Sequence, residues 1–492
     1  MSEPRFIAVL DVGRTNIKFA VVDLADRSEI AIATEPNRVC LDGPYPHFDV
    51  EAIWTFFCDR MRAHAARHPV DGISVSAHGA SVAMVGENGL ALPVLDYECE
   101  GPDELAAAYD AARPDFADTL SPRLPKGFNV GAQLFWLQRR FPGDFGNARV
   151  IMTYPQYWLW RMTGIASNEI TSIGCHTDLW DQRRRRWSTL VERQGWARKL
   201  APLHSATVPI GRLDAGLAKA WGLAEPVVVA GGLHDSNASL VPHLIDRKPP
   251  FTVQSTGTWA ISFGVGATPA SLDERRDTLA NTNIFGEPVP SARFKGGREF
   301  SIATGGDVVP VDTAALGAVL DKQIMLLPSV ASDSGPFPDV EAAWLPAVGA
   351  MTPAERFCAA SLYLALMSET CLDLIAATGP TIIDGPFSAN PTYRDALATL
   401  TVRDVVWSPT NTTGPSLGAA LLFDIQGGRS HKPGSTCMTA TGLAGASSAA
   451  FARYRDRWRA EAEARFYQSQ QSRSGAGIGS ERAATASRVG QA

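Results

Sequence analysis

The chain has 492 residues, of which 45% are hydrophobic and 20% are charged, and its formal net charge at pH 7 is −6. This length exceeds what a single hydrophobic core fills, so we expect at least two domains in a globular protein of ordinary composition. The negative charge disfavours a nucleic-acid-binding protein, and seven scattered cysteines without a CxxC pair indicate neither a disulfide framework nor a zinc site.

The sequence predicts a cytoplasmic location without a membrane anchor. Residues 1–13 contain charged side chains and enter a strand at once, which is not the pattern of a signal peptide. No uninterrupted apolar run reaches the roughly 20 residues of a membrane span. The cysteines fit buried thiols in a reducing compartment.

The first strong pattern is a hairpin at the start of the chain. Two apolar runs, residues 6–10 and 17–23, flank the turn DVGRTN and predict two antiparallel strands. The turn carries Asp11 and other polar groups, and its glycine leaves backbone N–H groups accessible. That composition suits a phosphate and, through Asp11, a hydrated Mg²⁺. Taken alone, such a turn is more often only a turn.

A helix and a strand follow. Residues 51–68 carry apolar side chains at helical spacing, and residues 72–76 return to a strand that ends near His78 and Gly79. A histidine beside glycine at a strand end is a candidate sugar contact. A capping or core histidine is an equal alternative on local grounds.

The next polar pair follows another hairpin. The turn at 85–89 leads to the apolar run 90–95, which ends in Asp96 and Tyr97, so a polar group again follows an apolar strand. Two helices are expected at 131–141 and 155–163, with tryptophans that pack the core. Four consecutive arginines begin at Arg183. We interpret this short run as a solvated surface because acidic residues flank it.

The most informative stretch spans residues 231–259. The apolar run 226–230 leads through two glycines to Asp235, so a buried strand ends in an acid. A second run, 251–254, ends in the Ser/Thr/Gly turn 255–258. Open α/β sheets place ligands at strand ends, and an acid beside such a turn suits a proton acceptor next to a phosphate cradle. Two ordinary loops with a helix N-cap are the plain alternative.

Beyond residue 259 the pattern restarts. We expect strands at 260–264, 300–302 and 381–383, and helices at 354–377, 394–400, 414–421 and 453–466. The strand at 300–302 would open onto Gly305 and Gly306, and the strand at 381–383 onto the turn 384–391. From residue 468 to 492, small and polar residues dominate without an apolar period, which predicts a disordered tail.

In this order, the turns resemble one family, the FGGY carbohydrate kinases, which are ATP-dependent sugar kinases with the actin-like ATPase fold. The matching segments are DVGRTNIKFAVVD at 11–23, SAHGASVAMVGENG at 76–89, YWLWRMTG at 157–164, GGLHDSNAS at 231–239, STGTW at 255–259 and GPSLGAALL at 414–422. Each segment is a loose match alone, but six in the family's order are specific.

The resemblance implies an α/β protein with two ribonuclease-H-like domains and a cleft between them. A sugar-binding domain would span 1–245 and a nucleotide-binding domain 246–467, joined through a proline-containing linker. The segments at 231–239 and 255–259 look most similar to the rhamnulokinase and fuculokinase branch, whose members phosphorylate deoxyketoses. The implied small-molecule partners are the sugar and ATP, with Mg²⁺ as cofactor. A homodimer is compatible with the resemblance, and neither nucleic acid nor a membrane is implied.

The resemblance also assigns roles to residues. Asp235 matches the family's general base, and Asp11 matches the carboxylate that holds Mg²⁺. The implied ATP and phosphate contacts are Gly13, Thr15, Asn16, Thr256, Gly257, Thr258, Gly305, Gly306, Gly385, Ser388 and Asn390. The implied sugar contacts are His78, Gly79, Asp96, Tyr97, His234 and Asp235. Phosphoryl transfer depends mainly on positioning and charge neutralisation.

One turn departs from the family. The adenosine turn usually reads as a glycine run, then Ser, a basic residue and Asn, whereas residues 384–390 read DGPFSAN. Pro386 and Phe387 reduce the backbone freedom of this turn, and Phe387 could stack on a base. Two alternatives therefore stand beside a deoxyketose kinase: a kinase for a pentulose, tetrulose or polyol, and a catalytically weak sugar or nucleotide sensor.

Overall fold

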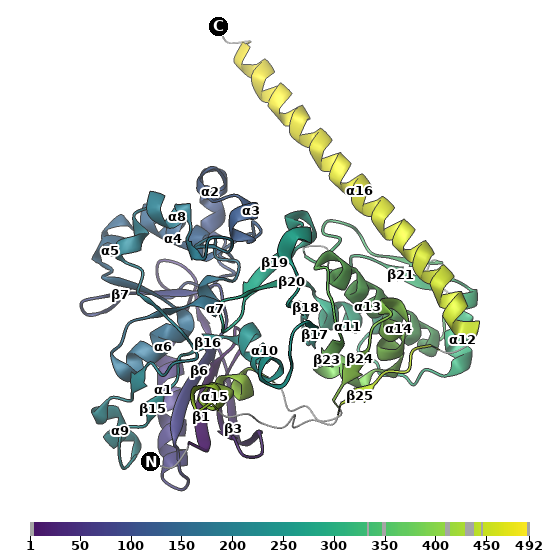
Figure 1. The fold of residues 1–492 in the computed structure, drawn as a ribbon. Helices are drawn as coiled ribbons and strands as arrows, with labels where there is room; N and C mark the ends of the chain where they lie inside the picture. Colours follow the sequence, from purple (N-terminus) through teal and green to yellow (C-terminus); the bar gives the residue numbers. More distant parts are fainter. Residues whose placement is uncertain are drawn as a thin grey trace. The chain divides into compact units, whose positions relative to one another are not determined.

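The computed structural model describes residues 4–331, 334–346, 351–408, 414–428, 437–443 and 446–489, with side chains up to residue 472. The chain forms two compact units (Figure 1). Unit 1 comprises Met1–Pro249, Leu279–Pro290 and Thr410–Thr436, and unit 2 comprises Pro250–Thr278, Ser291–Pro409 and Cys437–Ala492. Each unit is an α/β domain, as the sequence analysis predicted.

Unit 1 is built on a seven-stranded sheet. Its order is β14 (Gly211–Arg212), β15 (Val228–Val229), β6 (Gly72–Ala77), β1 (Phe6–Val12), β2 (Asn16–Asp23) and β3 (Ser28–Pro36), and β16 (Leu233–His234) also pairs with β6. β1 and β2 form the predicted antiparallel hairpin, in which Asp11 lies opposite Lys18. β6 runs parallel to both β1 and β16, so the ends of these three strands meet at one edge of the sheet.

Helices cover both faces of this sheet. α1 (Val50–Ala65) and α6 (Tyr154–Thr163) pack on one face through an apolar core that includes Phe57, Trp158 and Trp221. α10 (Asp235–Asp246) and α15 (Pro415–Gln426) pack on the other face. Because helices cover both faces of the sheet, the apolar run of β1 is largely buried and every residue of β6 is buried.

The other elements of unit 1 surround the sheet. The helices are η1 (Gly101–Leu105), α2 (Ala106–Ala112), α3 (Phe116–Thr119), α4 (Val130–Arg140), α5 (Pro142–Asn147), α7 (Ile170–Ile173), α8 (Thr189–Arg193), η2 (Trp196–Arg198) and α9 (Ala215–Trp221). The strands are β4 (Val39–Cys40), β5 (His47–Phe48), β7 (Val82–Gly86), β8 (Gly89–Leu92), β9 (Val150–Thr153), β10 (Asn168–Glu169), β11 (Trp180–Asp181), β12 (Arg186–Trp187) and β13 (Leu203–His204).

Helix α15 belongs to unit 1, although its residues follow most of unit 2 in the sequence. The sequence analysis assigned residues 414–421 to the second domain, whereas α15 packs against α10, β6 and β1 of unit 1. Small residues allow this contact: a Cβ built on Gly418 would lie 1.7 Å from the backbone oxygen of Ala238 in α10. The two helices therefore approach closely, because glycine leaves room for the neighbouring backbone.

We expect Gly418→Ala to destabilise unit 1 by about 1–3 kcal/mol or more, because the added methyl group forces α10 and α15 apart. Gly146→Ala in α5 is the matched control, since no atom lies within 4 Å of a Cβ built there. Thermal and denaturant unfolding of both variants measure the effect. Equal midpoints for the two variants would contradict the close packing of α15 on α10.

Most strands of the second seven-stranded sheet belong to unit 2. Its order is β19 (Thr278–Thr282), β20 (Pro288–Phe294), β18 (Ala260–Val265), β17 (Phe251–Thr256), β23 (Thr381–Asp384), β24 (Val405–Trp407) and β25 (Met438–Thr439). The helices of unit 2 are η3 (Pro269–Ser271), η4 (Glu274–Arg276), α11 (Gly296–Thr304), α12 (Thr313–Asp321), α13 (Pro353–Leu374), η5 (Pro386–Ala389), α14 (Pro391–Thr401) and α16 (Ala446–Val489). A further two-stranded sheet pairs β21 (Met325–Leu327) with β22 (Ala343–Leu345).

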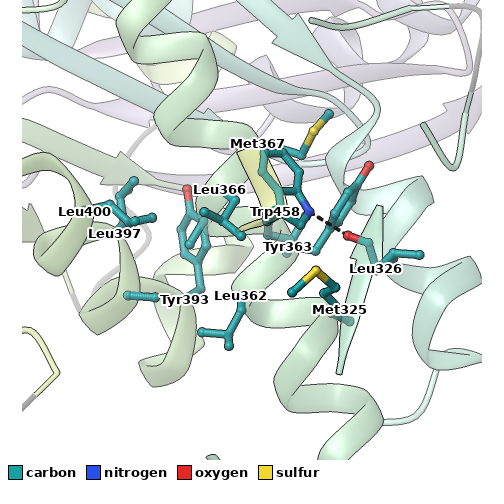
Figure 2. Close-up of a cluster of buried hydrophobic side chains, with 14 of the residues drawn as sticks. Met325, Leu326, Leu362, Tyr363, Leu366, Met367, Tyr393, Leu397, Leu400 and Trp458 are labelled. Carbon is teal, nitrogen blue, oxygen red and sulfur yellow. Dashed lines mark hydrogen bonds between the residues drawn. The ribbon is translucent and has the colours of Figure 1, made fainter. Parts of the chain in front are cut away.

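α13 lies at the centre of the unit 2 core (Figure 2). Trp458 of α16 packs beside Tyr363 of α13, and its indole N–H donates to the backbone oxygen of Leu326 at 2.7 Å. Among the described residues, α13 is the one helix long and apolar enough to cross a membrane. However, 89% of its most apolar window is buried inside the protein, as in the core helix of a soluble domain.

One sequence prediction was wrong in this unit. Residues 300–302 belong to helix α11, not to a strand: Glu299 and Ala303, four residues apart, are buried, while Ile302 is 53% exposed. The apolar spacing there is that of a helix face. In the same unit, α16 runs to Val489, and the disordered tail expected from residue 468 stays a prediction. Buried side chains between Phe451 and Phe466 anchor the first part of this helix.

Candidate functional site

The β1–β2 turn of unit 1 is held by its own backbone and by a neighbouring asparagine. The Gly13 N–H donates to the Asn16 oxygen at 2.9 Å, and the Asn37 side chain donates to the Gly13 oxygen at 2.8 Å. The Asn37 N–H donates to the Thr15 oxygen, also at 2.8 Å. Thr15 and Asn16 are exposed. The turn is thus rigid while its polar side chains remain accessible.

Asp11 lies at the end of β1, beside this turn. Burial raises the pKa of Asp11 to about 7, and the negative charge of Asp235 contributes to this shift, which Lys18 opposes. The Ser416 hydroxyl, at the start of α15, donates to the Asp11 carboxylate at 3.4 Å. The structure therefore brings the two sequence-predicted carboxylates close enough to repel each other.

Asp235 opens α10, directly after β16. The Ser236 N–H donates to Asp235 Oδ1 at 2.6 Å, and its hydroxyl does so at 3.3 Å. Although 29% of the Asp235 side chain is exposed, the surrounding protein raises the pKa of Asp235 to about 6 by desolvation. A carboxylate with this pKa is ionised at pH 7 and is a better proton acceptor than an ordinary aspartate.

His234 orients the Asp235 carboxylate. Burial lowers the pKa of His234 to about 4, so its ring is neutral at pH 7 and has one donor and one acceptor nitrogen. The Asn237 amide donates to His234 Nδ1 at 3.4 Å, which makes Nδ1 the acceptor. The Nε2–H group therefore donates to Asp235 Oδ1, at 3.2 Å. Asn237 was not singled out from the sequence, although it lies in the same HDSN segment.

His78 lies at the end of β6 among aromatic rings. Its ring centroid is 4.9 Å from those of Phe48 and Tyr154 and 5.2 Å from that of Tyr97. Burial lowers the pKa of His78 to about 4, so the ring is neutral. Nδ1 donates to the Gly79 oxygen at 2.9 Å, so Nε2 is an acceptor, and this buried atom has no hydrogen-bond partner among the described residues.

Arg14 links the phosphate-type turn to Asp96. Its guanidinium binds both carboxylate oxygens of Asp96, at 3.0 and 2.9 Å, and Glu98 at 3.4 Å. The Asp96 side chain is only 6% exposed. Both of its oxygens are thus engaged by Arg14, and Asp96 positions the segment that carries Tyr97. Burial raises the pKa of Tyr97 above its usual value, and the negative charge of Asp235 adds to the effect.

Glu169 is linked to His234 through Thr171. Its carboxylate accepts from the backbone N–H and the hydroxyl of Thr171, and the Thr171 hydroxyl accepts from the His234 N–H at 3.1 Å. Glu169 is 1% exposed, and burial raises its pKa to about 8. Glu169 is therefore largely protonated at pH 7.

We expect Glu169→Gln to stabilise the protein at alkaline pH. Because the folded-state pKa of Glu169 is raised from 4.5 to about 8, its stabilising contribution is complete below pH 4.5 and is lost as pH rises through 8. A neutral glutamine removes this loss, which is on the order of 5 kcal/mol. Melting temperatures between pH 5 and 9 should fall less steeply in the variant. Parallel curves for variant and wild type would show that Glu169 does not titrate in this range.

The second phosphate-type turn lies in unit 2, between β17 and β18. β17 extends to Thr256, so the turn itself is Gly257, Thr258 and Trp259, closed by the Gly257 N–H donating to the Trp259 oxygen at 2.8 Å. Thr258 is exposed. A Cβ on Gly297, at the start of α11, would lie 2.2 Å from the Gly257 oxygen, so α11 begins directly against the turn.

The turn 384–390 packs against Thr256, the last residue of β17. Gly385 has φ +89, and a Cβ there would lie 2.0 Å from the Thr256 oxygen, which explains the glycine. The Thr256 hydroxyl donates to the Asp384 oxygen at 2.6 Å and accepts from the Phe387 N–H at 3.1 Å. Phe387 is 8% exposed and belongs to the apolar core, so the suggestion that it stacks on a base was wrong.

Asn390 and Ser388 also have structural partners. The Asn390 side chain accepts from the Tyr393 N–H at 3.1 Å, which caps α14, and donates to the Ser361 hydroxyl at 2.9 Å. The Ser388 backbone oxygen accepts from Arg394 at 2.8 Å. These contacts fix the turn in place and leave backbone atoms, more than the Asn390 amide, to meet a ligand.

Gly305 and Gly306 end α11, at the other end of the helix from Gly257. Both have positive φ, and nothing lies within 4 Å of a Cβ built on either. Nine helical residues span about 13 Å, so these glycines do not share the contacts of the β17–β18 turn. A cavity of about 160 Å³ lies beside them, lined by Thr304, Asp307, Val309, Met351, Thr352, Pro353, Arg356 and Phe357.

The structure thus divides the predicted residues into groups. In unit 1 it gathers Asp11, Gly13, Thr15, Asn16, His78, Gly79, Asp96, Tyr97, His234 and Asp235 around the ends of β1, β6 and β16. In unit 2 it places Thr256, Gly257, Thr258, Gly385, Ser388 and Asn390 together, with Gly305 and Gly306 apart. Sequence reasoning missed Arg14, Asn237 and Ser416, although each lies within a segment that it had singled out.

Comparison with known proteins finds matches to both halves of the chain. The description "FGGY family of carbohydrate kinases, N-terminal domain" matches residues 6–242, and "Carbohydrate kinase FGGY, C-terminal domain" matches residues 248–432. The crystal structure of a carbohydrate kinase from Novosphingobium aromaticivorans is 36% identical, with a TM-score of 0.85 over 94% of this chain and 99% of that one.

Curated relatives are more distant. An L-fuculokinase from Salmonella typhi is 29% identical over 266 residues, and a xylulose kinase from Escherichia coli (strain K12) is 24% identical over 269 residues. Each match covers 52% of this chain. The chain spans only about half the length of these relatives, 55% and 53% respectively.

Proposed function

Because this chain belongs to the FGGY family of carbohydrate kinases, we propose that it transfers the γ-phosphoryl group of ATP to a hydroxyl group of a sugar. The observation that carries the proposal is the pair of half-buried carboxylates in unit 1, Asp11 and Asp235, beside the neutral histidines His78 and His234. A weak sugar or nucleotide sensor would need neither a raised Asp235 pKa nor a second acid next to it.

Asp235 is the general base in this proposal. As the sugar oxygen bonds to the γ-phosphorus and the bond from that phosphorus to the β-phosphate oxygen breaks, the hydroxyl proton passes to the Asp235 carboxylate and ADP leaves. The His234 Nε2–H and the Ser236 N–H orient Asp235 through Oδ1, so Oδ2 is the oxygen assigned to the proton. Fixed geometry of this kind is the main contribution that a protein makes to phosphoryl transfer.

The residues fit a magnesium ion. Asp11 is a half-buried carboxylate, and the negative charge of Asp235 raises the cost of ionising it unless a cation is bound. The described residues contain no group of three or more His, Cys, Asp or Glu side chains that could hold a metal. Mg²⁺ does not need one, since it commonly binds one or two carboxylates, with waters and phosphates as its other ligands. Bound there, Mg²⁺ would neutralise the phosphate charge, while Asp11 and Ser416 hold its position.

Phosphate groups are assigned to the two turns. In unit 1 the accessible hydroxyl of Thr15 and the amide of Asn16 follow Gly13, and in unit 2 Thr258 follows Gly257. Turn N–H groups and hydroxyls bind phosphate oxygens without adding charge to the transferring group. The surroundings of Gly305, Gly306, Gly385 and Ser388 are assigned to the nucleotide.

The proposed sugar is an uncharged deoxyketose such as rhamnulose or fuculose. These histidines are neutral and Arg14 is paired with acids, so the nearby net charge is negative and disfavours a sugar acid. The half-buried ring of Tyr97, which packs against Phe48 and His78, offers an apolar surface to a methyl group. A pentulose, tetrulose or polyol is the alternative, which the 24% identical xylulose kinase favours. We place the enzyme in the cytoplasm, where ATP is abundant.

The test is a substrate screen. Purified protein with MgATP is incubated with ketoses, deoxyketoses, aldoses, polyols and gluconate, and ADP release is measured against a control without sugar. We expect turnover with at least one uncharged ketose and none with gluconate. No turnover above the ATPase background with any compound would overturn the kinase proposal and favour the sensor.

A further inference from the structure

A cavity of about 300 Å³ lies in unit 1, between the strand β3 and the last turns of α1. β3 ends the strand order of the first sheet, and β2 and β3 contribute Phe19, Ile30, Ala31, Ile32 and Ala33 to the lining. Phe19 is 3% exposed, whereas Ile30 and Ile32 are 51% and 58% exposed. The sheet side of the cavity is therefore apolar, from a buried ring to two exposed isoleucines.

The helix side of the cavity is basic. It is lined by Arg60, Ala63, His64, Arg67 and His68, whose spacing of three and four residues places them on one face of a helix. The N–H groups of Arg67 and His68 donate to the His64 oxygen at 3.0 and 2.9 Å, so the chain keeps turning beyond the last residue of α1. These five side chains thus form one face opposite the sheet.

The inward face of α1 changes character along its length. In the earlier turns, Ile53, Phe57 and Met61 are buried in the apolar core that the helix shares with the sheet. The next residues of this face are His64 and His68, although the strands opposite them remain apolar. Because polar side chains are costly to bury without partners, the end of the helix does not close on the sheet, and a cavity remains.

The lining of the cavity carries positive charge. Among the described residues that line it, none is acidic. The Arg60 guanidinium lies 3.5 Å from the carboxylate of Glu35, outside the lining, whereas the Arg67 guanidinium has no hydrogen-bond or ion-pair partner in the described part of the chain. Burial lowers the pKa of His64, so its ring is neutral at pH 7, and its buried Nε2 has no partner among the described residues. The cavity thus combines an unpaired cation and a buried polar atom with an apolar wall.

We propose that this cavity binds a small organic anion. The apolar body of the ligand contacts Phe19 and the isoleucines of β3, and its carboxylate or phosphate group binds Arg67. A volume of about 300 Å³ lies at the lower end of the range for small-molecule clefts, which combine apolar walls with a few polar groups. The inference goes beyond the proposed function, since none of the lining residues is among those assigned to ATP, magnesium or the sugar.

Calorimetry on the full chain tests the site with two apolar anions, phenyl phosphate and benzoate. We expect a Kd on the order of 1 mM for the better of the two, and the ratio of their affinities shows which anionic group the site prefers. Benzyl alcohol, which lacks the charge, and inorganic phosphate, which lacks the apolar body, should each bind at least about tenfold more weakly.

Arg67→Gln should weaken binding of the better probe about tenfold, because it removes the unpaired cation, and Arg67→Lys should retain most of the affinity. Ala63→Phe fills the cavity and should abolish binding. Arg62→Gln, on the same helix, is the matched control: Arg62 pairs with Asp59 at 2.6 Å and does not line the cavity, so this variant should bind as wild type. All of these positions are exposed, so melting temperatures should change little.

The inference is overturned if neither anion binds up to its solubility limit, or if benzyl alcohol binds as tightly as the anions. Binding that is unchanged in both Arg67→Gln and Ala63→Phe would place the anion elsewhere on the chain and would also overturn it. Light scattering supplies a further check: a dimer that Arg67→Gln or Ala63→Phe converts to monomers would mean that a second copy covers the cavity. None of these measurements needs ATP or a sugar, so the result stands whether or not the chain is a sugar kinase.

Discussion

Asp235→Asn is expected to reduce kcat for sugar phosphorylation by about 10²–10⁴-fold, because the amide cannot accept the hydroxyl proton. The folded protein and its nucleotide affinity should be retained, since asparagine has nearly the same size and can accept the bond from the Ser236 N–H. Single-turnover assays measure the first effect and equilibrium titration with ATP the second. A variant with more than about half of wild-type activity would remove Asp235 from the role of base.

The pH dependence gives a second readout of the same residue. Only ionised Asp235 can accept a proton, and its pKa is raised to about 6, so kcat/KM for the sugar should fall about tenfold per unit below pH 6 and level off above it. This acid limb should be absent from the residual activity of Asp235→Asn. Removing the Asp235 charge should also lower the pKa of Asp11, which that charge raises.

The stability of Asp235→Asn should change in the opposite direction to its activity. The folded-state pKa of Asp235 is raised from 3.8 to about 6, so the contribution of this group to stability is complete below pH 3.8 and is lost as pH rises through 6. At pH 8 the variant should therefore melt at a higher temperature than the wild type. Such a gain, together with lost activity, would identify Asp235 as a residue maintained for catalysis at the expense of stability.

Asp11→Asn is expected to reduce kcat on the order of 10³-fold, because the neutral amide holds Mg²⁺ poorly and metal-assisted charge stabilisation contributes several kcal/mol. The wild type should bind ATP more tightly with Mg²⁺ than without it, and this difference should shrink in the variant. Asp26→Asn, on the exposed surface of the same unit, is the control. If the magnesium dependence of nucleotide binding were unchanged in Asp11→Asn, Asp11 would not hold the metal.

Much of the local structure could be predicted from the sequence. The apolar runs of β1, β2 and β17 and the glycine-containing turns beside them depend on neighbouring residues, so they are visible in a short window. The same kind of reasoning failed at residues 300–302, where three residues were too few to distinguish a strand from the face of α11.

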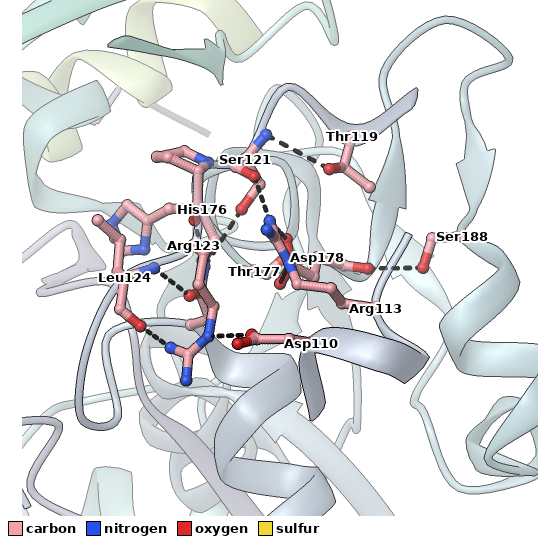
Figure 3. A network of polar contacts seen from close by, with 12 residues as sticks. Asp110, Arg113, Thr119, Ser121, Arg123, Leu124, His176, Thr177, Asp178 and Ser188 are labelled. Atoms are coloured by element: carbon pink, nitrogen blue, oxygen red, sulfur yellow. Dashed lines mark hydrogen bonds and ion pairs between the residues drawn. The ribbon is translucent and has the colours of Figure 1, made fainter. Parts of the chain in front are cut away.

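The sequence by itself therefore determined the strands, the turns and the chemical types of the site residues, including Asp11 and Asp235. Only the tertiary structure decided their electrostatics, because burial and charge depend on residues far apart in the chain. Ser416 meets Asp11 across 405 positions and Arg14 meets Asp96 across 82. Likewise, the left-handed backbone of His176, with φ +38, exists only because Asn129 and the partners of Asp178 impose it (Figure 3). No short pattern carries that information, since contacts between distant segments impose the conformation and the order of residues alone does not.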